Sequence, residues 1–99
     1  MTAQKMRVFL EIYFKPNEEL EDRIKRSVTA PFRFDGAGFL NGPRPEKNFE
    51  YVARVPAKGV PKLRRLAHTL RRFKGIKSIS FAVYENIPLT KGPFGLRRT

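Results

Sequence analysis

The strongest constraint on the fold is the order in which two hydrophobic periodicities follow one another along the 99 residues. In four segments apolar residues alternate with other residues, which is typical of strands with two different faces. In two segments apolar residues recur every three to four positions, which is typical of amphipathic helices. The expected strands are residues 6–14, 33–40, 48–55 and 76–84, and the expected helices are residues 18–28 and 60–74.

Single residues with special backbone preferences mark the ends of these segments. Asn17 is predicted to cap the first helix, because its side chain accepts from a free backbone N–H. Pro61 suits the first turn of the second helix, and Gly75 is predicted to end it. Gly36 and Gly38 weaken the second strand and indicate a bulge or a close backbone approach.

The resulting order is β-α-β-β-α-β, the pattern of a ferredoxin-like α+β sandwich. We expect a four-stranded antiparallel sheet with both helices on one face. The predicted domain is residues 1–85. Residues 86–99 contain prolines and glycines without a hydrophobic period, so we expect them to form an extended basic C-terminal arm.

The alternation predicts which strand residues face the helices and which face outward. We expect the inward residues to be Val8, Leu10, Ile12, Tyr51, Ala53, Val55, Ile79, Phe81 and Val83. The outward face then carries residues suited to base stacking or to an interface, namely Phe9, Tyr13, Arg54 and Tyr84. Of base stacking and an interface, we favour the interface, in which these residues are buried against a dimer mate or against the C-terminal arm.

Positive charge is concentrated in the second half of the chain, and the formal net charge is +12. Residues 54–99 contain twelve Lys and Arg residues and one acidic residue, whereas residues 1–53 contain nine basic and eight acidic residues. Solubility does not require such a skew, because mixed charges would provide it without self-repulsion. The pattern therefore indicates a polyanionic partner.

The second helix carries most of this charge opposite its apolar stripe. Arginine binds phosphate through two parallel, charge-assisted hydrogen bonds, so a row of arginines is predicted to grip a nucleic-acid backbone. The predicted nucleic-acid-binding residues are Lys62, Arg64, Arg65, His68, Arg71, Arg72, Lys74, Lys77, Arg97 and Arg98. The alternatives are a solvated helix face without a partner and a surface that docks on an acidic protein or a membrane surface.

Catalytic chemistry is not indicated. The only histidine lies among arginines, and no His, Asp or Glu residues have the spacing of metal ligands, so we expect no catalytic residue, no metal and no cofactor. The chain has no cysteine and no apolar run of the roughly 20 residues that would span a bilayer. We expect a soluble, cytoplasmic protein without a membrane partner.

The element order, the first strand ending in Lys15-Pro16-Asn17 and the basic helix within residues 49–84 give the chain a resemblance to a known family. The chain resembles the ferredoxin-like protein of the bacterial ribosomal small subunit, the sixth in its series. The likeness covers most of the chain as topology, although Phe34–Gly38 departs from the basic strand expected there. The resemblance implies RNA contact.

The leading hypothesis is a non-catalytic nucleic-acid-binding protein, with RNA favoured over DNA. The competing hypothesis is a protein-interaction or inhibitor module that docks on an acidic protein or forms a homodimer through the open face of its sheet. Such a module could be encoded by a phage.

Overall fold

Four long strands, one short strand and two helices form the part of the chain that the computed structural model describes, residues 5–86 and 96–98. The first half contains β1 (Lys5–Phe14), α1 (Glu18–Ser27), β2 (Arg33–Leu40) and β3 (Glu46–Pro56). A short 3-10 turn, η1 (Ala57–Gly59), leads into α2 (Val60–Arg71), and β4 (Ile76–Asn86) and β5 (Leu96–Arg98) follow. All six predicted elements are confirmed, and their order is as predicted.

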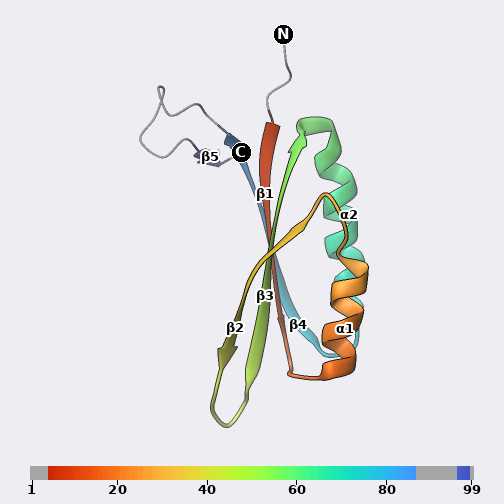
Figure 1. Cartoon of the computed structure of the whole chain (residues 1–99), viewed down its shortest axis with the longest axis vertical. Helices are drawn as coiled ribbons and strands as arrows, with labels where there is room; N and C mark the ends of the chain where they lie inside the picture. Colours follow the sequence, from red (N-terminus) through yellow and green to blue (C-terminus); the bar gives the residue numbers. More distant parts are fainter. Residues whose placement is uncertain (1–4, 87–95, 99) are drawn as a thin grey trace.

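The strands form one antiparallel sheet in the order β2-β3-β1-β4-β5. Figure 1 shows both helices on the same side of this sheet. The fold is therefore the predicted ferredoxin-like βαββαβ sandwich. Residues Leu96–Arg98 of the predicted arm extend the sheet by pairing with residues 84–86 of β4, and residues 87–95 and 99 lie outside the described part.

The core forms between the sheet and the helices. Val8, Leu10, Ile12 and Phe14 are fully buried on alternate positions of β1. The inward residues predicted for β3 are also buried, and Phe49 joins them. On β4, Ile79 is buried, whereas Phe81 and Val83 are partly buried against the core.

Both helix starts follow the sequence signals. The Asn17 side chain accepts from the Leu20 N–H at 3.0 Å, so it caps α1 as predicted. Pro61 lies in the first turn of α2. The predicted bulge in β2 is present as a register shift between Phe34 and Gly36.

The end of α2 corrects the predicted boundary. The helix ends at Arg71 rather than at residue 74, because Arg72 and Phe73 bond to carbonyls three residues back and tighten the chain into turns. Gly75 follows with a φ of 99°, the left-handed backbone that suits glycine, and turns the chain into β4. It ends this turn rather than the helix itself.

Candidate functional site

The outward side of α2 is the most basic helix surface in the described part of the chain. Leu63, Ala67 and Leu70 bury the opposite stripe, so the polar residues are left facing solvent. We call these exposed residues the basic face of α2: Lys62, Arg64, Arg65, His68, Arg71 and Arg72. None of them forms an ion pair with a carboxylate within residues 5–86, where the ion pairs are Lys47–Glu21 and Lys77–Glu46.

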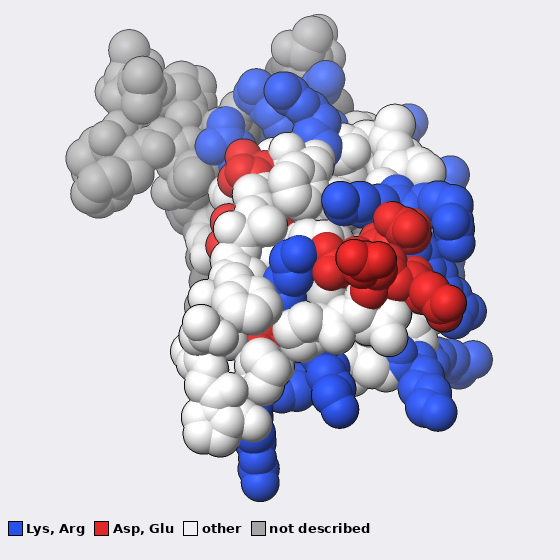
Figure 2. Space-filling model, turned by 60° about the horizontal axis from the view of Figure 1, so that its bottom comes forward, with Lys and Arg blue, Asp and Glu red and all other residues white. Residues whose placement is uncertain are grey.

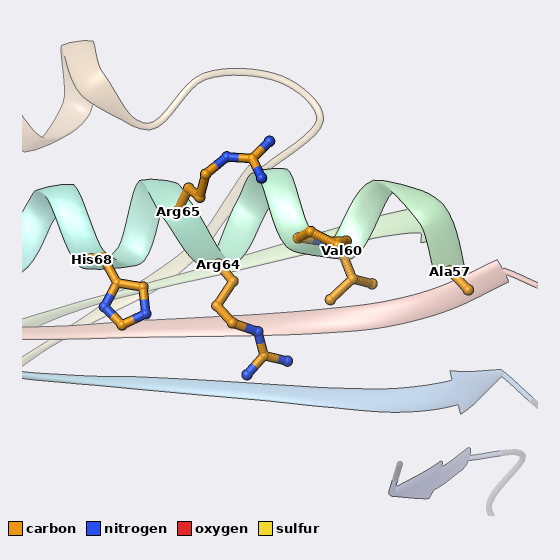
Figure 3. Close-up of a pocket in the computed structure, with 6 residues that line it drawn as sticks. Ala57, Val60, Arg64, Arg65 and His68 are labelled. Atoms are coloured by element: carbon orange, nitrogen blue, oxygen red, sulfur yellow. The ribbon is translucent and has the colours of Figure 1, made fainter.

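The arginines of the basic face form two rows rather than the single row predicted. Arg64 lies over the Phe81 ring, 5.1 Å from the ring centroid, and Arg71 Nη2 donates to the Ile79 carbonyl at 3.4 Å. These two guanidiniums are therefore held against β4. Figure 3 shows Arg64 and His68 pointing toward the strands, whereas Arg65 points away from them.

The first half of α2 borders a shallow hollow of about 480 Å³. Two guanidiniums and one imidazole line it, and none of its lining residues is acidic. The lining residues are Ala57, Val60, Pro61, Arg64, Arg65 and His68, and Figure 3 labels all of them except Pro61. An anion entering this hollow meets hydrogen-bond donors from both rows of the basic face.

Other predicted nucleic-acid-binding residues lie away from α2. Lys74 lies in the turn after the helix and lines a second hollow together with Lys15 and Arg23. Lys77 is paired with Glu46 at 3.4 Å, so a carboxylate of the same molecule already balances its charge. Arg97 and Arg98 belong to β5, where they pair in register with Glu85 and Tyr84 of β4, respectively.

The sheet face opposite the helices, here called the open face, carries the four residues predicted for stacking or an interface. Phe9 and Tyr84 meet edge to face with ring centroids 5.5 Å apart. Tyr13 lies two rows further along β1, where its hydroxyl donates to Glu11. That hydrogen bond is the main cause of a raised pKa of Tyr13, followed by burial and then by the charges of Glu11, Glu50 and Glu46. Arg54 is exposed.

A second basic cluster on the open face is absent from the sequence prediction. Arg7, Arg33 and Arg54 line a hollow of about 440 Å³, together with one acidic residue, Asp35, and the apolar Phe9 and Val52. The β1–β3 register brings Arg7 and Arg54 opposite each other, and the β2–β3 register adds Arg33 opposite Val52. The alternation of residues along β1 and β3 already places Arg7 and Arg54 on the outward face. The position of Arg33 depends in addition on the bulge in β2.

Acidic residues are concentrated at the start of α1. The first turn of α1 carries Glu18, Glu19 and Glu21. In the view of Figure 2 carboxylates gather mainly in one patch, and lysine and arginine side chains surround it. Within residues 5–86 and 96–98, no group of three His, Asp or Glu residues is arranged to hold a metal ion. The described helices are also too short or too polar to cross a membrane.

No family model and no curated protein sequence matches the chain. Among solved structures, it is similar to the crystal structure of the ACT domain from GTP pyrophosphokinase of Chlorobium tepidum, with 13% identity and a TM-score of 0.53. That match covers 78% of this chain and 97% of the domain. The solution structure of the same domain gives 13% identity and a TM-score of 0.51, covering 78% of this chain and 85% of the domain.

A putative antibiotic biosynthesis monooxygenase from Bacillus cereus has 13% identity and a TM-score of 0.44, with 84% of this chain and 93% of that chain covered. At such identities the two ACT-domain structures support the fold alone. The resemblance to the ribosomal protein stays a prediction.

Proposed function

We propose that this protein is a non-catalytic nucleic-acid-binding protein that holds backbone phosphates on the basic face of α2. RNA is favoured over DNA, in line with the resemblance to the ribosomal protein. The observation that carries the proposal is that, within the described residues, none of the four arginines of the basic face forms an ion pair, although the chain contains nine acidic residues. Like charges on one helix repel one another, and an anionic partner relieves this repulsion.

The two rows of arginines differ in how firmly their side chains are held. Arg64 contacts the Phe81 ring and Arg71 the Ile79 carbonyl, so a phosphate has less side-chain freedom to restrict at these two arginines. They are seven residues apart, about 10.5 Å along a helix. Arg65 and Arg72 are exposed and repeat the same spacing.

A non-catalytic role agrees with the surroundings of the one histidine. His68 is exposed and lines a hollow that contains no acidic residue, so no carboxylate in that hollow orients it for acid–base chemistry. The lack of cysteine agrees with work in a reducing cytoplasm.

The test is a salt titration of RNA binding by fluorescence anisotropy, with purified protein that has been freed of bound nucleic acid. If about six phosphates are neutralised, the slope of log affinity against log salt is about −4 to −5. The variant R64Q/R65Q/R71Q/R72Q should lose most of the binding while its far-UV circular dichroism stays unchanged, because all four side chains are exposed.

The matched control removes four exposed positive charges elsewhere, in the variant K5Q/K25Q/R26Q/R44Q. This control should retain most of the affinity. Equal losses in the two variants would mean that only net charge matters. RNA binding that does not change with salt would contradict phosphate contact altogether. Binding to an acidic protein with no RNA binding would favour the interaction-module alternative.

A further inference from the structure

The open face carries two pairs of like charges directly opposite each other on neighbouring strands. Arg7 of β1 lies opposite Arg54 of β3, and Glu11 lies opposite Glu50. Between these two rows lies an apolar row in which Phe9 faces Val52 on one side and Ala82 on the other. Along the strands, the order is therefore an arginine row, an apolar row and a glutamate row.

Within one molecule this arrangement is unfavourable. Like charges directly opposite each other in a sheet destabilise the pairing, and opposite charges stabilise it. Exchanging Arg54 and Glu50 would have given two favourable cross-strand pairs. Within the described part of the chain none of the four charged residues forms an ion pair, and Glu11 accepts a hydrogen bond only from the Tyr13 hydroxyl.

The rows match a copy of themselves that is turned end for end. A two-fold axis that lies across the strands at the apolar row brings the arginine row of each sheet over the glutamate row of the other. Arg7 then meets Glu11 of the partner subunit, and Arg54 meets Glu50 of the partner subunit. Phe9 and Val52 meet their own copies at the centre, where burial of apolar surface contributes most.

We propose that this protein forms a homodimer through the open face, with its two sheets packed face to face and their strand directions reversed. The half-buried Phe9, Val52 and Ala82 supply the apolar centre, and the half-buried Tyr84, in the arginine row, packs against Phe9. Four strands about 4.8 Å apart and roughly 33 Å long offer roughly 600 Å² of flat area before side-chain relief is added. This approaches the accessible surface of about 800 Å² per partner that a specific interface buries.

The mixed charge of the open face favours a second copy over a polyanion. Phosphates attracted by Arg7 and Arg54 would be repelled by Glu11 and Glu50 one row beyond the apolar row. In the dimer the helices lie on the outer sides, because they cover the other face of each sheet. The basic face of α2 therefore remains accessible, and the proposal does not depend on nucleic-acid binding.

The test measures the dimer dissociation constant of the full chain by sedimentation velocity, in wild type and in the variant E50R. The substitution places an arginine over Arg54 of the partner subunit at two symmetry-related positions, so we expect the constant to rise at least about 100-fold. Within the monomer the same change replaces the Glu11–Glu50 repulsion with an opposite-charge pair. The fold should therefore be retained, as measured by circular dichroism.

The double variant E50R/R54E makes the face self-complementary again, and we expect it to restore the dimer. The matched control E19R, which reverses a charge at an exposed position of α1 on the opposite layer, should dimerise like wild type. Nuclease-treated protein is used throughout, and E50R should still bind RNA through α2. A wild-type chain that stays monomeric at about 100 μM, a range in which weak specific dimers form, would overturn the proposal.

An oligomer that E50R leaves intact would also overturn it. That result would point instead to the exposed edge of β2, where Phe34, Phe39 and Leu40 are 53%, 56% and 68% exposed.

Discussion

Replacing Tyr51 with phenylalanine should make the fold more stable, although most Tyr→Phe changes in protein cores do the opposite. Tyr51 is only 4% exposed and is surrounded by aromatic rings, with the centroids of Phe34, Phe32 and Phe49 at 5.5, 6.5 and 6.5 Å. Its hydroxyl is buried and has no hydrogen-bond partner among the described residues. Burying a hydroxyl without a partner costs about 1–3 kcal/mol.

Tyr51→Phe removes this cost and keeps the ring contacts, so we expect the free energy of unfolding to rise by about 1 kcal/mol. For a domain of this size that corresponds to an increase in Tm of about 4–8 °C. Tyr13→Phe is the matched control, because the Tyr13 hydroxyl does donate, to Glu11. It should give no gain, or a loss of about 0.5–1.5 kcal/mol.

Alkaline pH gives a second measurement on the same residue. Burial raises the pKa of Tyr51 above its ordinary value of 10.0. Above pH 10 the unfolded chain loses this proton while the folded chain keeps it, so stability falls as pH rises through this range. In Tyr51→Phe the fall should be shallower than in wild type. Thermal unfolding followed by circular dichroism at pH 7 and at pH values above 10 measures both effects, and a lower Tm for Tyr51→Phe at pH 7 would refute the argument.

Two further predictions concern α2 and the turn that follows it. Each of the variants R64Q/R71Q and R65Q/R72Q should make the salt slope of RNA binding less negative by about 1.4–1.8, because each removes two phosphate contacts. If anisotropy titrations of one variant show an unchanged slope, the arginines of that row have a structural role instead. Gly75→Ala should lower the free energy of unfolding in urea by about 1–3 kcal/mol, since the φ of 99° is strained for alanine and the new Cβ would lie 2.8 Å from Leu20 Cδ2; wild-type stability would contradict this.

The order of elements and the buried faces of β1, β3 and β4 were predictable from the sequence because both depend on local periodicity. Val8, Leu10 and Ile12 lie on the same face of β1 whatever strands pair with it, and all three are fully buried. The end of α2 was less predictable. Phe73 fits the helical stripe, yet it packs against the core from a turn, where the Arg23 guanidinium lies 4.0 Å from its ring centroid.

Interactions between distant parts of the chain were not predictable. Glu21 of α1 pairs at 2.6 Å with Lys47 of β3, 26 residues away in sequence. Lys77 was expected to support phosphate binding, but it meets Glu46, 31 residues away in sequence. Both outcomes depend on strand register, which the bulges in β1–β4 and β2–β3 pairing shift. A pattern read along one segment does not determine that register.

The same register explains why the two proposed surfaces differ in kind. Residues of α2 need only avoid the core on one side, so their charge is not limited by neighbours, and all six residues of the basic face are exposed. Residues of the open face have fixed cross-strand neighbours, so each charge there is set against a specific opposite residue. One-sign charge on a free helix face suits a partner that is itself uniformly charged, such as a phosphate backbone. Alternating rows of charge on a sheet suit a partner with the same spacing, and a second copy of the sheet has that spacing by construction.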